Sequence, residues 1–211
     1  MAPTNAPALD PDAIAAALRR PLPGFAAQGR MAVRPRPGGF TPPEDITPRE
    51  SAVLILLYPR DGALHVALIL RSEDGGSHSG QVSFPGGGQH PGEPFEETAL
   101  RESGEEVGLD PGAVRLLGTL TPLYVPASGN RMHPFVGYTP SPPRWAIDPV
   151  EVQAVFDAPL AFFVDEGNVR EETWQFGEYP VRVPQFNVKG HVVWGATAML
   201  LAELAAALKG T

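Results

Sequence analysis

Two long apolar runs joined by a tight turn constrain the fold of this chain most. Residues 52–58 read AVLILLY, residues 64–70 read LHVALIL, and Arg60-Asp61-Gly62 lies between them. Apolar runs on either side of such a turn signal predict a hairpin of two antiparallel strands. Because polar residues hardly interrupt either run, both faces of these strands should be buried. The pattern favours an α/β or α+β domain in which helices cover a mixed sheet.

The character of the chain changes near residue 50. Ten of its 25 prolines lie in residues 1–50, where the only helical pattern is Pro11 to Arg20, with Asp10 as its N-cap. Residues 1–50 are therefore predicted to form a proline-rich arm with a short helix, packed on a domain that spans residues 51–211. Within that domain the sequence predicts further strands at 114–120, 132–138, 150–156 and 179–183, and helices at 93–107 and 194–208.

Composition excludes several classes of function. The chain has 211 residues, a formal charge of −8 and no cysteine, so any metal must bind to oxygen or imidazole. The acidic balance argues against nucleic acid as a partner, since such proteins carry excess Lys and Arg. No apolar run reaches the roughly 18–20 residues of a membrane span, and no signal peptide is recognised. We expect a cytoplasmic protein that acts on a small molecule.

An unusual density of acidic residues marks the segment from Glu93 to Glu106. It holds six acids and one base, and so supplies −5 of the whole charge of −8. On a helix, Glu102, Glu105 and Glu106 share an arc of roughly 100°, which leaves the opposite face to be buried. Like charges this close repel one another, whereas a divalent cation with hard oxygen ligands, such as Mg²⁺ or Mn²⁺, makes the cluster favourable. The cluster therefore suggests phosphate chemistry, against the alternative of a solvated acidic face.

Small residues around the cluster favour the metal hypothesis. Gly104 lies within the predicted helix, where it costs about 1 kcal/mol relative to Ala, and Ser103 stands on the buried side. Both allow another backbone to approach closely. The glycines at 86–88 precede the helix, and backbone amides in such a loop can approach a pyrophosphate, although a plain turn explains them equally well.

The pattern resembles the Nudix box. Gly87, five residues, Glu93, seven residues and then residues 101–109, RESGEEVGL, match it, with Ser103 where the family has an aliphatic residue. The seven fixed positions have roughly one chance in 10⁸ of arising by coincidence at a given start. The resemblance implies a Nudix-type α/β/α sandwich with a mixed sheet. It also implies metal-assisted attack of water on the pyrophosphate of a nucleoside diphosphate derivative.

The resemblance assigns roles to the residues of the box. Glu102 and Glu106, one turn apart, are predicted to be the principal metal ligands, and Glu105 a further ligand or the general base. Arg101, within reach of Glu97 and Glu105, is predicted to orient a carboxylate. Glu93 precedes the helix and either braces the loop or shares in metal binding. In some relatives a later loop supplies the base, and for that role Glu151 is the candidate.

The segment before the box resembles the signature of coenzyme A pyrophosphatases. Ile69 replaces a Thr of that signature and Gly76 replaces its second Arg, so another cation, for example His78, must substitute for the lost phosphate contact. Phe84 is favoured as a core residue rather than a stacking partner. The matching residues are Arg71, Ser72, Gly80, Phe84, Pro85, Gly86 and Gly87, and the resemblance implies that all of them except Pro85 bind substrate.

The resemblance implies that the chain splits coenzyme A or its derivatives into 3′,5′-ADP and 4′-phosphopantetheine or its acyl form. Hydrolysis of another dinucleotide, such as ADP-ribose or NADH, is the alternative among enzymes, and a non-catalytic nucleotide sensor is the alternative of another class. The sequence leaves a homodimer open. It also leaves open which cation meets the 3′-phosphate of coenzyme A, with Arg170, Arg182 and Lys189 as candidates.

Overall fold

A mixed sheet forms the centre of the computed structural model, which describes residues 10–36, 38–73 and 79–209. Within these ranges the sheet has eight strands in the order β3-β2-β1-β7-β5, with β4 paired to β1, β6 to β7 and β8 to β2. The strands are β1 (Arg49–Arg60), β2 (Ala63–Arg71), β3 (Val82–Ser83), β4 (Gly86–Gly88), β5 (Arg115–Thr119), β6 (Leu123–Val125), β7 (Asn130–Tyr138) and β8 (Val152–Pro159).

The predicted hairpin forms the middle of this sheet. β1 and β2 pair in antiparallel fashion from Arg60 and Ala63 inward, and the connecting residues Asp61 and Gly62 both have positive φ angles, of 49° and 79°. Positive φ at both positions is the geometry that matches the twist of a two-residue hairpin. β1 and β7 are parallel whereas the other pairs are antiparallel, which confirms the predicted mixed sheet.

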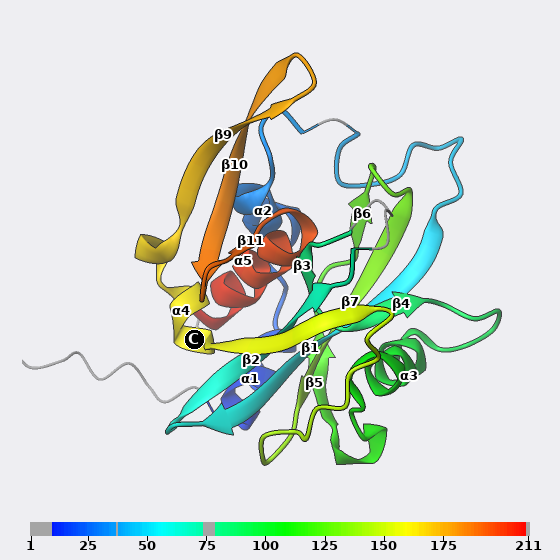
Figure 1. Cartoon of the computed structure of the whole chain (residues 1–211), viewed down its shortest axis with the longest axis vertical. Coiled ribbons are helices and arrows are strands. Elements are labelled where there is room, and N and C mark those ends of the chain that lie inside the picture. The colour runs from blue at the N-terminus through cyan, green and yellow to red at the C-terminus, as the bar shows by residue number, and fades with distance from the viewer. Residues whose placement is uncertain (1–9, 37, 74–78, 210–211) are drawn as a thin grey trace, which may run out of the picture.

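Helices cover both faces of the sheet, as the uninterrupted apolar strands predict. Successive residues of β1 point to opposite faces. The set Ala52, Leu54 and Leu56 packs with α3 (Phe95–Val107), whereas Val53, Ile55 and Leu57 belong to the larger core on the other side. Figure 1 shows α3 alone on its side and the remaining helices opposite it. These are α1 (Pro11–Leu18), α2 (Gly24–Gln28), α4 (Leu160–Val164) and α5 (Gly195–Lys209). The α/β/α sandwich is therefore confirmed.

α3 begins two residues later than predicted and ends where predicted. Pro94 is its N-cap residue, and Gly108 ends it in the left-handed conformation with φ 68°. The Gly108 amide donates to the carbonyls of Ser103 and Gly104. A Cβ at Gly108 would also lie 2.7 Å from that of Ala146, so both backbone angle and space require glycine there.

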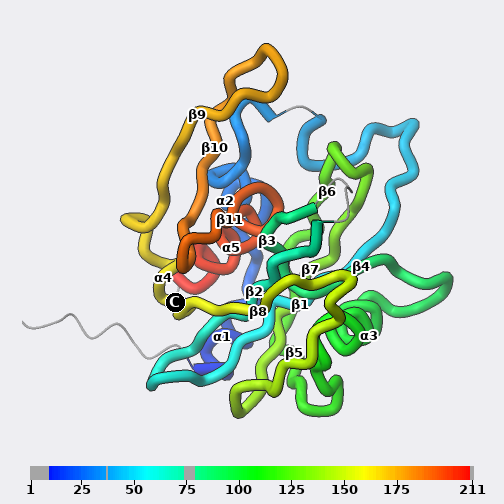
Figure 2. The backbone as a smooth tube through the Cα atoms, viewed as in Figure 1, coloured from blue at the N-terminus to red at the C-terminus, as the bar shows by residue number. Residues whose placement is uncertain are grey.

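The described part of the arm contributes to the core of the domain. Ile14 and Met31 are buried in the cluster on the α5 side of the sheet. Asp10 caps α1 as predicted, since its carboxylate accepts from the amide of Ala13 at 2.8 Å. Figure 2 shows the chain after α2 passing the β9–β10 hairpin and crossing toward β6 before it enters β1. The division of the chain at residue 50 stays a prediction.

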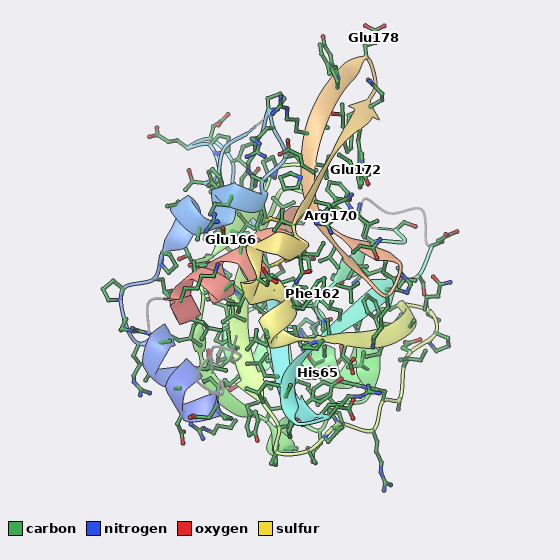
Figure 3. All side chains as sticks on the ribbon, turned by 90° about the vertical axis from the view of Figure 1, so that its left-hand side faces the viewer. His65, Phe162, Glu166, Arg170, Glu172 and Glu178 are labelled. Atoms are coloured by element: carbon green, nitrogen blue, oxygen red, sulfur yellow. The ribbon has the colours of Figure 1, made fainter. Side chains whose placement is uncertain are left out.

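A second, smaller sheet projects from this body. It consists of β9 (Arg170–Phe176), β10 (Tyr179–Val188) and β11 (His191–Val193), in the order β11-β10-β9. Figure 3 shows Glu178 at the outer tip of the β9–β10 hairpin and Arg170 near its base. The sequence predicts only residues 179–183 of this sheet as a strand. Among the described residues, no helix is long and apolar enough to span a bilayer.

Candidate functional site

Helix α3 places its three clustered carboxylates in different surroundings. Glu106 is only 1% exposed, the Glu102 side chain is 15% exposed and that of Glu105 is 61% exposed. The helical wheel predicts one shared face opposite the buried side, and for Glu106 this is wrong. β4 covers that part of the helix, and the amide of Gly86 donates to Glu106 Oε2 at 2.8 Å. Ser103 and Val107 are buried, as the wheel predicts.

The carboxylate of Glu106 is held between one cation and two other acids. Burial raises the pKa of Glu106 to about 7, which the Gly86 amide and Arg71 oppose and the charges of Glu151 and Glu102 reinforce. Arg71 donates to Glu106 Oε1 at 3.0 Å. The ionised form of Glu106 is therefore costly here, and an added cation close to it would lower that cost.

Arg101 gathers the carboxylates on the outer side of α3. It donates to Glu93 at 2.8 Å, to Glu102 at 2.8 Å and to Glu105 at 3.0 Å. A further N–H binds the carbonyl of Gly88 at 3.0 Å. The Glu105 contact is one of the two that the sequence predicts, but Glu93 stands in place of the predicted Glu97. These hydrogen bonds from Arg101 fix the orientation of Glu102 beside β4.

Glu93 braces the loop that leads into α3. Its carboxylate accepts from Arg101, from the Thr98 hydroxyl at 2.7 Å and from the His90 amide at 3.1 Å. The hydrogen bond from Arg101 is the main reason that the pKa of Glu93 is lowered to about 2. Of the two roles that the sequence leaves open, these contacts favour the brace.

The donors at this site fit a divalent cation that keeps water and substrate oxygens. Glu102 and Glu106 lie on consecutive turns beside the glycines of β4, and both offer hard oxygen ligands. Within the described ranges, no three His, Asp or Glu side chains gather closely enough to enclose an ion by themselves. Mg²⁺ commonly binds through one or two carboxylates and completes its shell with water and phosphate. Two carboxylates would suffice for such an ion, and Glu105 as a further ligand stays a prediction.

A cleft of about 540 Å³ opens beside β4, whose three glycines line it, whereas Glu102, Glu105, Glu106 and Glu151 are not among its lining residues. Of the predicted substrate-binding residues, Arg71, Phe84, Gly86 and Gly87 line it. Phe84 is 2% exposed and belongs to the core, as the sequence predicts.

Two other residues of the predicted substrate site do not line the cleft. The Ser72 hydroxyl donates to the carbonyl of Pro149 at 3.2 Å, and the Ser72 amide donates to the carbonyl of Glu151 at 2.9 Å. Ser72 therefore positions the loop that carries Glu151. The amide of Gly80 donates to the carbonyl of Ser72 at 3.3 Å. Gly76 and His78 lie outside the described residues.

Three residues that sequence reasoning missed line the same cleft: Arg36, Phe176 and Trp194. Trp194 lies 5.0 Å from Trp174 and 6.2 Å from Phe176 between ring centroids, so β9 and the residue before α5 together form an aromatic cluster. Arg36 comes from the proline-rich arm, where no periodic pattern or motif marks it. Only the folded arm brings it to the cleft.

Comparisons with known proteins agree with this geometry. The chain is 36% identical to Nudix hydrolase 15, mitochondrial, of Arabidopsis thaliana over 176 residues, which cover 77% of this chain and 60% of that protein. It is also 36% identical to an uncharacterized Nudix hydrolase, NudL, of Salmonella newport over 166 residues, 77% of this chain and 84% of that protein. This chain thus spans less than two thirds of the plant relative.

The fold itself has a solved counterpart. The MutT protein from Methanosarcina mazei Go1 superposes with a TM-score of 0.51 and 14% identity, over 80% of this chain and all of that one. The model of the NUDIX domain matches residues 48–174, more than half of the chain. This chain therefore belongs to the NUDIX domain family.

Proposed function

We propose that this protein hydrolyses the pyrophosphate bond of coenzyme A and its derivatives with the help of Mg²⁺ or Mn²⁺. The products would be 3′,5′-ADP and 4′-phosphopantetheine or its acyl form. One observation carries the proposal. Arg71, from the segment that resembles the coenzyme A signature, donates to Glu106, from the Nudix box, beside the cleft. A residue of each motif, 35 positions apart in the sequence, thus meets the other at one site.

Glu102 and Glu106 are the proposed metal ligands. When bound, such an ion neutralises charge on the diphosphate oxygens and lowers the pKa of a water molecule. Arg101 keeps Glu102 turned toward β4, and the Gly86 amide keeps Glu106 in place. Both carboxylates are therefore oriented before substrate binds, which reduces the reorganisation that the reaction requires.

Arg71, Gly86 and Gly87 are the proposed diphosphate contacts. Arg71 is partly exposed and donates one N–H to Glu106. Other N–H groups of its guanidinium can therefore donate to a phosphate oxygen. Gly86 and Gly87 line the cleft without side chains, which lets a diphosphate approach the backbone closely.

Glu151 is better placed than Glu105 to accept the proton of the attacking water. The charge of Glu151 acts on Glu106, and the Ser72 amide holds the Glu151 backbone. Both side chains are exposed, but Glu105 pairs with Arg101. We infer that Glu151 is the general base. Glu105 is the alternative, and mutating each residue separately would distinguish the two.

The alternatives differ in substrate or in the absence of catalysis. ADP-ribose or NADH would use the same diphosphate contacts. A non-catalytic sensor would have no need of the four box glutamates, and all four, Glu93, Glu102, Glu105 and Glu106, are present. Their retention supports an enzyme. Cytoplasmic location and a homodimer stay predictions.

A substrate panel tests the proposed function. The purified protein is incubated with Mg²⁺ or Mn²⁺ and coenzyme A, acyl-coenzyme A, NADH, ADP-ribose or diadenosine polyphosphates, and the products are identified by mass. We expect coenzyme A derivatives to give the highest kcat/KM and to need the metal, with a chelator as the control. Much faster turnover of ADP-ribose would contradict the substrate. Inertness toward every compound would contradict the hydrolase.

A further inference from the structure

Arg36, from the arm, lines the same cleft as Arg71. Its Nε donates to the carbonyl of Gly39 and its Nη2 to the carbonyl of Tyr124 in β6, each at 2.9 Å. The guanidinium carbon lies 5.0 Å from the centroid of the Phe40 ring. The side chain is thus held in one orientation by contacts from the arm and the sheet.

The charge of Arg36 has no anionic partner among the described residues. Its hydrogen-bond acceptors are the two carbonyls and the sulfur of Met199 at 3.5 Å, and no described carboxylate lies within 4.0 Å. Burial lowers the pKa of Arg36. A guanidinium has five N–H groups, and these contacts use three, which leaves two for a ligand. Arg71, the other arginine of the cleft, already has Glu106.

The cations that the sequence offers for the 3′-phosphate are engaged elsewhere. Arg170 donates to the carbonyls of Gly167 and Val169 near the base of the hairpin (Figure 3). Lys189 pairs with the buried Asp157 at 2.8 Å, and Arg182 lies 3.6 Å from Glu171. None of these three is among the residues that line the cleft.

We propose that Arg36 binds a second anionic group of the substrate, a phosphomonoester separate from the diphosphate that Arg71 meets. The proposal rests on the proposed function, because coenzyme A carries such a group on its ribose and ADP-ribose does not. A planar guanidinium with two free N–H groups matches two oxygens of one phosphate. The same contact selects for coenzyme A over substrates that lack the extra phosphate.

The kinetic test compares two substrates that differ only in this phosphate. For Arg36→Gln, kcat/KM for coenzyme A should fall about tenfold or more through KM, whereas kcat/KM for dephospho-coenzyme A should change less than about twofold. Arg34→Gln is the matched control, since Arg34 lies in the same arm, is half exposed and pairs with Glu171 on the second sheet. An equal loss with both substrates would overturn the proposal and leave Arg36 as a structural tie.

A binding measurement tests, without turnover, whether Arg36 binds a second phosphate group. Wild-type protein should bind 3′,5′-ADP about tenfold or more tightly than AMP in calorimetry, and Arg36→Gln should lose that preference. Arg36→Lys, which keeps the charge without the planar fork, is predicted to retain part of it and provides a second variant should the glutamine protein unfold. If wild-type protein binds both nucleotides equally, the proposal is wrong, whether or not the protein hydrolyses coenzyme A.

Discussion

The backbone of Gly87 lies directly against the carboxylate of Glu102. A Cβ added to Gly87 would stand 2.2 Å from Glu102 Oε2 and 2.5 Å from its Cδ, whereas one added to Gly88 would meet nothing within 4 Å. Contacts as short as 2.2 Å do not occur between real atoms of this kind, so any side chain at Gly87 must displace Glu102. The glycine of the Nudix box is thus required here by the position of a proposed metal ligand.

Gly87→Ala should therefore reduce activity by displacing Glu102. Misplacement of a catalytic group by about 1 Å can cost about 100-fold in rate, and we expect a loss in kcat of that order. Gly88→Ala is the matched control and should stay within about threefold of wild type. Steady-state kinetics and a thermal midpoint for each variant make the comparison. A Gly87→Ala protein with wild-type kcat would refute the role given to Glu102.

Glu106→Gln should remove most activity while the protein stays folded. The amide oxygen can still accept from the Gly86 amide, but the negative charge that we propose for the metal is lost. We expect kcat to fall about 10³-fold or more, as for removal of a principal catalytic electrostatic contact. Glu97→Gln changes an exposed carboxylate on the same helix and should have little effect. Circular dichroism and kinetics of both variants provide the measurement.

Asp157 lies in a buried cluster outside the cleft and gives the protein an acid-sensitive stability. It accepts from Tyr58 at 2.7 Å, from Arg60 at 2.6 Å and from Lys189 at 2.8 Å. Burial alone would raise the pKa of Asp157, but these hydrogen bonds outweigh it and hold the pKa well below its usual range. A lowered pKa in the folded state stabilises the protein above the unfolded-state pKa, about 3.9.

Stability is therefore predicted to fall as the pH drops from about 4 through the folded-state pKa of Asp157. Asp157→Asn should cost about 3 kcal/mol at neutral pH, because it leaves two cations beside a buried neutral group, and should flatten the acid side of the profile. Asp61→Asn, at an exposed turn, should leave the profile as it is. Urea unfolding between pH 2 and 7 measures all three proteins. An unchanged acid slope in Asp157→Asn would contradict this assignment.

Glu203 ties the arm to the last helix. It is fully buried, and its carboxylate accepts from Gln28 at 2.7 Å, from the Thr121 hydroxyl at 2.6 Å and from the Gly24 amide at 3.2 Å. In Glu203→Gln, the new side-chain NH₂ group faces one of these N–H or O–H donors, which then lacks an acceptor. The substitution should therefore lower the free energy of unfolding by about 2 kcal/mol.

Limited proteolysis adds a local readout for Glu203→Gln. Cleavage within residues 10–36 should become faster than in wild type, since the arm loses its attachment to α5. Glu178→Gln, at the hairpin tip, is the control and should change neither stability nor cleavage. Stability and proteolysis that match wild type would show that Glu203 does not hold the arm.

The central sheet and α3 are predictable from sequence because local pattern and tertiary role agree there. The two apolar runs fix β1 and β2, and Gly108 ends α3 where a residue with positive φ is needed. The β9 strand escapes prediction because residues 170–176, REETWQF, are mostly exposed on both faces and so lack an apolar period.

The environment of each site residue depends on contacts that no local pattern contains. Motif spacing identifies Glu106 on α3, but a helical wheel does not include β4, whose Gly86 amide donates to the Glu106 carboxylate. Likewise, Arg36 reaches the cleft only because the arm crosses between β6 and α5. Motif spacing therefore identifies the carboxylates, whereas their burial and their partners follow from the fold.

Titration with Mn²⁺, followed by electron paramagnetic resonance of the free ion, tests most directly whether Glu102 and Glu106 form a metal site. The wild-type protein should bind at least one ion per chain, and Glu102→Gln and Glu106→Gln should each weaken that binding about tenfold or more. Equal Mn²⁺ affinity in wild type and both variants would contradict the account.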